Sequence, residues 1–150
     1  MGGTQMHLSA KLKYALCAML ELGLQHRNQF ISVTTLSEKR SIPGPFLEKL
    51  LLELKRAGLT VSRRGPDGGY SLALPPDEIR IGDIFTAVDG PVNFSEGFEL
   101  QESSEICGFF AELEQEVRDV LNTKTLHELC CHARKIKRLP QPTHSHPFSI

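Results

Sequence analysis

The six residues from Arg64 to Gly69 restrict the fold of this chain more than any other part of its sequence. Their order is Arg-Gly-Pro-Asp-Gly-Gly, and glycine, proline and aspartate are the residues that tight β-turns require. The stretches on either side, Leu59 to Arg63 and Tyr70 to Leu74, are short and strand-like. The pattern therefore predicts a β-hairpin with basic residues at its tip, which is the form of a wing.

Two predicted helices begin the chain. Ser9 can cap the first, whose apolar stripe runs from Leu12 to Gly23 at helical spacing. Ser32 or Thr34 can begin the second, a two-turn helix that continues through Arg40.

A third predicted helix follows the break at Pro43-Gly44-Pro45. It starts near Pro45, because proline is tolerated at a first helical position, and ends at Gly58. Its inward side chains are expected to be Phe46, Leu47, Leu50, Leu51 and Leu54. Two helices about four residues apart, followed by the hairpin and a short helix from Ile79 to Val88, predict a winged helix-turn-helix over residues 8–90.

The second half of the chain has a different pattern. Residues 91–105 are rich in glutamate and show no regular period, so we expect an exposed loop. Apolar residues then recur at steps of four and three, which predicts a long helix with a seam for a partner helix. The seam residues are Ile106, Phe110, Leu113, Val117 and Val120. Thr125 to Glu128 fit a capping box that begins a last helix, and residues 139–150 look like a disordered tail.

Charge is segregated along the chain, although the net charge is only −1. Residues 1–64 hold ten Lys or Arg and four Asp or Glu, residues 65–128 hold three and fourteen, and residues 129–150 hold four and none. A basic half can approach a polyanion while an acidic middle stays in water or faces a partner. This distribution favours nucleic acid as a partner, with ordinary variation of surface charge as the alternative.

Other functional classes conflict with the sequence. It contains no Gly-rich phosphate loop between a strand and a helix, no nucleophile elbow and no His/Glu zinc motif, so an enzyme is not expected. Its apolar runs are far shorter than the roughly 20 residues that a membrane-spanning helix needs. The four cysteines are irregularly placed and no leader sequence is recognisable, so we expect reduced thiols and a cytoplasmic protein.

The third helix and the hairpin supply the candidate contacts with double-stranded DNA. In winged-helix docking the helix enters the major groove and the wing meets the backbone or the minor groove, where arginine suits the negative potential. Glutamate in the helix can accept from a cytosine amino group. The candidate residues are Pro43, Pro45, Phe46, Glu48, Lys49, Lys55, Arg56, Arg63, Arg64, Gly65, Gly68 and Gly69. The alternative is a solvated basic face with glycines that merely turn the hairpin.

Several of these segments carry a resemblance to a known family. They are Leu8 to Ala15, Phe46 to Leu50, Leu54 to Leu59 and above all the wing motif from Arg64 to Tyr70. Together they resemble the Rrf-type bacterial winged helix-turn-helix regulators over about residues 8–136. The resemblance implies transcriptional control by a homodimer on a pseudo-palindromic operator. It also implies that residues 91–105 are a sensor-type loop and residues 106–138 are dimerisation helices.

The sensor is where this sequence departs from the family. Members that bind an iron–sulfur cluster carry three cysteines in the loop before the dimer helix, because soft thiolates hold such clusters. Here that region offers only Cys107, and Phe110 stands where one branch of the family has a histidine. Cys107 is therefore a candidate cluster ligand that lacks two of the usual three cysteines, a redox-sensing thiol or a simply buried residue.

Two further alternatives remain open. The residues His127, Cys130, Cys131 and His132 lie close together in the sequence. Neighbouring positions on a helix point in different directions, so a metal site there would need ligands from elsewhere. The acidic middle can also serve as a docking surface. The protein would then be a cluster-less co-regulatory module that acts mainly through a regulatory protein partner, as one branch of the family does.

Overall fold

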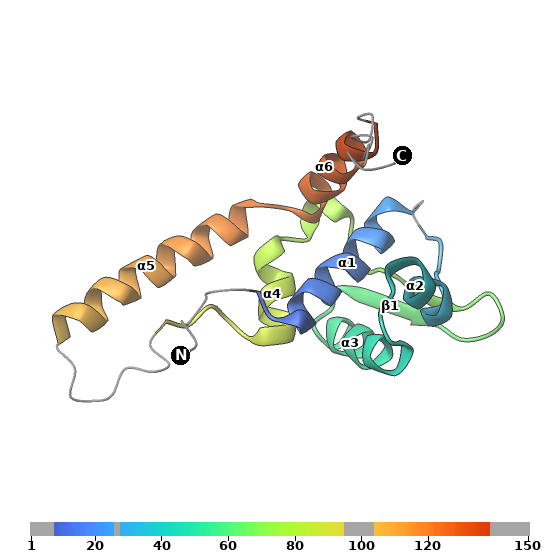
Figure 1. The fold of residues 1–150 in the computed structure, drawn as a ribbon, viewed down its shortest axis with the longest axis horizontal. Helices are drawn as coiled ribbons and strands as arrows, with labels where there is room; N and C mark the ends of the chain where they lie inside the picture. Colours follow the sequence, from blue (N-terminus) through green and yellow to red (C-terminus); the bar gives the residue numbers. More distant parts are fainter. Residues whose placement is uncertain (1–7, 26–27, 95–103, 139–150) are drawn as a thin grey trace, which may run out of the picture.

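The computed structural model describes residues 8–25, 28–94 and 104–138. The predicted tail at 139–150 and part of the predicted loop, residues 95–103, lie outside these ranges. The described residues form a mainly helical fold with one two-stranded antiparallel hairpin (Figure 1). The elements are α1 (Ala10–Leu24), α2 (Val33–Arg40), α3 (Gly44–Arg56), β1 (Thr60–Arg63), β2 (Gly69–Leu72), η1 (Pro76–Glu78), α4 (Ile81–Asp89), α5 (Ser104–Thr123) and α6 (Leu126–Arg138). This confirms the predicted fold class, a winged helix-turn-helix followed by a long C-terminal helix.

One apolar core joins the helices of the first ninety residues to α6. The helix α1 contacts α2, α3, α4 and α6, so it forms the centre of this core (Figure 1). On α3 the predicted leucines Leu47, Leu50, Leu51 and Leu54 are at most 1% exposed. Burial of a leucine side chain contributes about 1.5–3 kcal/mol. The leucines therefore fix one face of α3 against the core and leave the opposite face to solvent.

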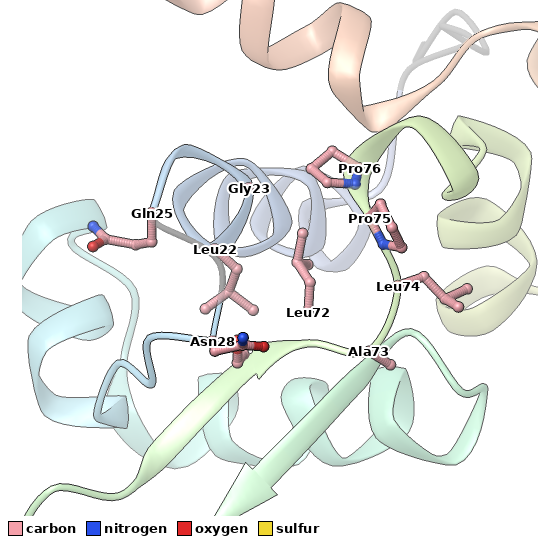
Figure 2. Close-up of a pocket in the computed structure, with 10 residues that line it drawn as sticks. Leu22, Gly23, Gln25, Asn28, Leu72, Ala73, Leu74, Pro75 and Pro76 are labelled. Carbon is pink, nitrogen blue, oxygen red and sulfur yellow. The ribbon is translucent and has the colours of Figure 1, made fainter.

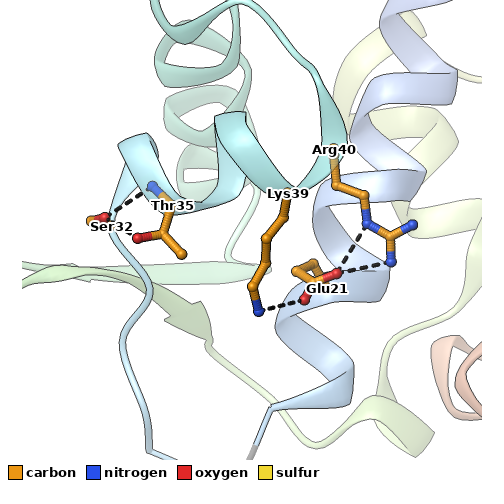
Figure 3. Close-up of polar contacts among 5 residues, drawn as sticks. All are labelled: Glu21, Ser32, Thr35, Lys39 and Arg40. Carbon is orange, nitrogen blue, oxygen red and sulfur yellow. Dashed lines mark hydrogen bonds and ion pairs between the residues drawn. The ribbon is translucent and has the colours of Figure 1, made fainter.

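The carboxylate of Glu21 on α1 ties α2 to the core. Its side chain is only 10% exposed and lies in an otherwise apolar stripe. It accepts hydrogen bonds from Nζ of Lys39 and from Nε of Arg40, each at 3.0 Å (Figure 3). Burial alone would raise the pKa of Glu21, but the hydrogen bonds and positive charges of Lys39 and Arg40 outweigh it and lower this pKa. The ion pairs thus set how α2 lies against α1.

A backbone bridge attaches the wing to the helix-turn-helix. Ile31, in the connection between α1 and α2, donates its N–H to the Tyr70 carbonyl at 2.9 Å and accepts from the Tyr70 N–H at 2.8 Å. Gly69, the preceding residue, has φ of +145°, and a Cβ there would clash with the Ile31 carbonyl. The last glycine of the wing motif is therefore required for the wing to approach this connection.

The last helix, α6, returns to the body and packs on α1. The predicted capping box is confirmed: Glu128 accepts from the Thr125 N–H at 2.8 Å, and the Thr125 hydroxyl accepts from the Glu128 N–H at 3.2 Å. Cys130 is buried against Gly23, where a Cβ would come within 2.7 Å of the Cys130 sulfur. Burial raises the pKa of the Cys130 thiol, so this cysteine is a core residue and not a reactive group.

Some details of the prediction are wrong. Phe46 is not in the core: it is 38% exposed and packs edge-to-face on Tyr14, with ring centroids 5.6 Å apart. The reason is that Phe46 lies at the edge of the leucine stripe, about 100° around the helix from Leu47. The helix α5 begins at Ser104, so the predicted loop 91–105 ends two residues too late. Apolar periodicity does not reveal a helix start whose first two residues, Ser104 and Glu105, are polar.

We expect Glu21→Gln to lower the free energy of unfolding by about 1–3 kcal/mol at pH 7, because two cationic donors lose their charged acceptor. The pKa of Glu21 is lowered in the folded state. Its contribution is therefore fully present above the unfolded value of about 4.3 and is lost as the pH falls through the folded value. Urea unfolding of both proteins at pH 7 and pH 3 measures the difference.

Glu53→Gln is the matched control for this prediction. Glu53 forms an ion pair of 2.7 Å with Lys11, and both side chains are more exposed than that of Glu21. Its loss should cost at most about 1 kcal/mol. Equal costs for the two substitutions at pH 7 would show that Glu21 is no more than a surface ion pair.

Candidate DNA interface

The outer face of α3 carries most of the predicted contact residues. Pro45, Glu48 and Lys49 are exposed, because the buried leucines hold the opposite face of the helix in the core. Pro43 caps α3 without a side-chain hydrogen bond. No capping side chain therefore competes with an external acceptor for the N–H groups of the first turn, where the helix dipole favours an anion such as phosphate.

Lys55 connects α3 to the wing. Its Nζ donates a hydrogen bond to Oγ of Ser62 on β1 at 2.6 Å, and both side chains are exposed. Behind them, the buried Thr60 hydroxyl donates to the Leu51 carbonyl at 3.3 Å. The outer faces of α3 and β1 therefore adjoin. We call their cationic residues the basic surface: Lys49, Lys55, Arg56, Arg63 and Arg64, all of them exposed.

The two arginines of the wing have different surroundings. The Arg63 guanidinium carbon lies 4.3 Å from the centroid of the Phe30 ring, and the guanidinium also donates weakly to the Asp67 carbonyl at 3.4 Å. Arg64 makes no hydrogen bond or ion pair with any other described residue. Arg63 is therefore held in one orientation, whereas Arg64 can extend toward a ligand.

Glu48 places a negative charge beside this basic surface. Two causes raise the pKa of Tyr70 on β2: burial, which is the larger, and the negative charge of Glu48. The Glu48 carboxylate therefore influences a residue at the base of the wing electrostatically. A carboxylate repels phosphate and can accept from the cytosine amino group. This position therefore suits discrimination between bases and not attachment to the backbone.

The predicted contact residues differ in exposure. All of them are exposed except Gly68 and Gly69, which are half-buried. Gly69 packs against Ile31, as described above, and a Cβ on Gly68 would clash with the Arg63 carbonyl. These two glycines shape the wing from inside, and the sequence motif by itself did not separate that role from a DNA contact.

The helix α5 extends away from the body of the protein (Figure 1). It carries the residues of the predicted seam. Four of the five seam residues are exposed, from 36% for Phe110 and Val117 to 58% for Val120, and Leu113 is half-buried. Phe109, which the seam prediction missed, is 59% exposed and lies edge-to-face on Phe110, with centroids 6.0 Å apart. It falls outside a strict heptad, and the adjacent pair of phenylalanines was its only signal.

The side chains of Glu114 and Arg118 hold the first residues of the predicted sensor loop. They form an ion pair of 2.5 Å one turn apart on α5. Glu114 accepts from the Phe94 N–H at 2.9 Å, and Arg118 donates to the Val92 carbonyl at 2.7 Å. We call this arrangement the clasp. It joins the backbone of residues 92–94 to α5, and sequence reasoning did not identify it.

Cys107 does not have the partners that a three-cysteine cluster requires. It is half-buried near the start of α5, and residues 91–105 contain no cysteine. The described ranges contain no group of three or more His, Cys, Asp or Glu that could hold a metal ion. On α6, Nε2 of His127 lies 3.4 Å from Sγ of Cys131. No third His, Cys, Asp or Glu among the described ranges joins this pair to form a metal site. The residues present do not fit the family's cluster, and we derive no cluster chemistry for this chain.

A cleft of about 270 Å³ lies between the C-terminal end of α1 and the segment that follows β2 (Figure 2). Leu22 and Leu72 line it from the two sides, and Pro75 and Pro76 lie at one end. None of its lining residues has an ionisable side chain, so this cleft offers no acid–base pair for catalysis.

Each helix among the described residues is too short or too polar to span a lipid bilayer.

Comparison with known proteins identifies a family. The model of the Rrf2 family, described as iron-dependent transcriptional regulators, matches residues 8–132. A Synechocystis sp. protein named as an HTH-type transcriptional regulator is 36% identical over 133 residues, which cover 86% of this chain and 90% of that protein. The HTH-type transcriptional regulator CymR of Bacillus subtilis is 32% identical over 127 residues, or 85% of this chain and 91% of that protein.

A solved structure shares the fold as well. T. potens IscR superposes with a TM-score of 0.76 at 27% sequence identity, covering 93% of this chain and 96% of that chain. The relatives by sequence are transcriptional regulators with a helix-turn-helix, which agrees with the prediction of a DNA-binding protein and with the argument against an enzyme. This chain therefore belongs to the Rrf2 family of DNA-binding transcriptional regulators.

Proposed function

We propose that this regulator binds DNA as a homodimer, with α3 in the major groove and the wing on the backbone or in the minor groove. The bond between Lys55 and Ser62 carries this proposal, because it joins α3 and the wing into one basic surface. In this proposal residues 8–90 bind DNA, residues 91–103 are the sensor-type loop and residues 104–138, which begin with α5, are the dimerisation helices. The cytoplasm is the compartment we infer, since the regulator meets DNA there.

The residues of the basic surface divide by chemistry. The positive charges of Lys49, Lys55 and Arg56 attract DNA phosphates. These contacts contribute affinity but carry no information about the base sequence. Arg64 extends toward the minor groove, whose negative potential suits arginine. The start of α3 carries sequence preference, through Glu48 and the neighbouring exposed residues Pro43, Pro45 and Phe46.

The seam on α5 is the surface through which we propose that two copies associate. A groove of about 280 Å³ runs along it, lined mostly by apolar side chains that include Leu113, Val117 and Val120. A second α5 would bury these side chains by the knobs-into-holes packing of short coiled coils. A two-fold dimer would then place two copies of α3 on half-sites about one helical turn of DNA apart, or a multiple of it.

The substitution Arg64→Gln tests the role of the wing. We expect it to weaken binding to cognate and scrambled DNA alike and to lower the slope of log K against log salt by about 1, because one charged contact is lost. Fluorescence anisotropy titrations at several salt concentrations measure both quantities. Lys137→Gln, which removes the same charge from α6, should leave the slope as in the wild type. An unchanged slope for Arg64→Gln would remove the wing from the interface.

The substitution Glu48→Gln tests the role of α3. We expect it to change the preference among operator variants by about 1–3 kcal/mol at one base pair, because an amide no longer selects a cytosine donor as a carboxylate does. Competition of single-substituted operators against the parent sequence measures this change. An equal change in affinity for every sequence would show that Glu48 acts only through its charge.

The substitution Val117→Lys tests the dimer. An unpaired charge in an apolar interface costs several kcal/mol, so we expect the dimer dissociation constant to rise at least about 100-fold. Sedimentation equilibrium measures it. Gln115→Lys is the matched control, because it adds the same charge on another side of α5, and it should remain dimeric. A dimeric Val117→Lys variant would place the interface elsewhere.

Binding experiments with the purified wild-type protein also separate direct binding from binding through a regulatory protein partner. We expect the purified dimer to shift promoter DNA alone. A shift that appears only after addition of cell extract would support the co-regulatory alternative instead.

A further inference from the structure

The side chain of Phe30 lies beside the wing, although its residue belongs to the connection between α1 and α2. The guanidinium carbon of Arg63 lies 4.3 Å from the centroid of the Phe30 ring. An aromatic face attracts a guanidinium electrostatically at this distance. The weak hydrogen bond from Arg63 to the Asp67 carbonyl adds a second restraint. One arginine of the wing is therefore held between a ring outside the wing and the turn of the wing itself.

The backbone geometry explains why these two side chains meet. β1 pairs with one edge of β2, with Arg63 directly opposite Gly69. The connection that contains Phe30 pairs with the other edge of β2, through the bridge between Ile31 and Tyr70. Gly69 has no side chain, so the long side chain of Arg63 crosses β2 without obstruction and reaches the ring. The last glycine of the wing motif thus serves both the bridge and the arginine–ring contact.

The contact lies on the accessible side of the wing. Arg63 is exposed and Phe30 is half-buried. The ring lines an open groove of about 380 Å³ between the turn of the wing, at Pro66 and Asp67, and the start of α2, at Ser32 and Thr35. Because the side chain of Arg63 is itself exposed, its guanidinium remains in solvent while it contacts the ring, and it stays able to meet a phosphate.

We propose that Phe30 is a positioning residue for DNA binding, which holds the Arg63 guanidinium in the orientation in which the wing meets the DNA. This inference rests on the proposed use of the wing. A planar guanidinium stacked on a ring keeps its N–H edges free for an anion. Ordering a long side chain at an interface costs affinity, and an arginine ordered beforehand avoids that cost. The wing then combines an arginine held on a ring, Arg63, with an exposed arginine that has no partner among the described residues, Arg64.

A double-mutant cycle tests the proposal. The variants are Phe30→Leu, Phe30→Tyr, Arg63→Gln and the double variant Phe30→Leu/Arg63→Gln, compared by anisotropy titration on cognate and scrambled DNA. We expect Phe30→Leu to weaken binding about two- to fivefold on both DNAs, the fold-change that corresponds to an exposed cation–π contact. The salt slope should stay as in the wild type because the charge of Arg63 remains. Phe30→Tyr keeps the ring and should bind as the wild type does.

The double variant separates positioning from a general structural role. If Phe30 acts through Arg63, the double variant binds as weakly as Arg63→Gln alone. If Phe30→Leu weakens binding further in the Arg63→Gln background, or if Arg63→Gln weakens binding and Phe30→Leu does not, the positioning role is wrong. Thermal unfolding of each variant sets a titration temperature at which all are folded.

The same series distinguishes failure of this inference from failure of the proposed wing contact. If neither Arg63→Gln nor Arg64→Gln changes affinity or salt slope, the wing does not touch DNA and both proposals fall. If Arg64→Gln changes affinity or salt slope and Arg63→Gln changes neither, the wing contact stands and the role of Phe30 is overturned.

Discussion

The backbone bridge between Ile31 and Tyr70 is the contact on which the winged-helix part of this protein depends. A two-stranded hairpin is marginal by itself in water, and here the bridge supplies pairing on its second edge. Because the bridge joins the wing to the connection between α1 and α2, the same core sets the positions of both α3 and the wing. Gly69 makes the approach possible, so a residue of the wing turn determines the geometry of a distant connection.

The sequence predicts those features that depend on residues close together in the chain. Ser9 caps α1 by accepting from the Leu12 N–H at 3.1 Å, and Thr125 and Glu128 cap α6, all within three positions. Contacts between distant residues could not be predicted in this way. Glu21 signals the need for a cationic partner by lying in an apolar stripe, but only the packing of α2 on α1 identifies Lys39 and Arg40 as its partners.

The sequence predicts which helix and which hairpin form the candidate site. It predicts much less well what surrounds each side chain of that site. The periodicity of its leucines shows which face of α3 remains outside, and the turn motif shows where the wing lies. The sequence treats Arg63 and Arg64 as equivalent, whereas the structure holds Arg63 on Phe30 and leaves Arg64 exposed, without a hydrogen bond or ion pair to another described residue. That difference arises from the bridge across β2, which joins segments about forty residues apart and leaves no local pattern.

The segregation of charge along the sequence has a counterpart in the fold. The basic surface lies on α3 and the wing, while α5 carries an acidic flank that phosphate would repel. The clasp through Glu114 and Arg118 fixes residues 92–94 to this same helix. In the proposed dimer, a shift of α5 changes the separation of the two wings. Half-site spacing is set by the helical repeat of DNA. Such a shift therefore alters affinity for a two-fold operator and leaves affinity for a single half-site unchanged.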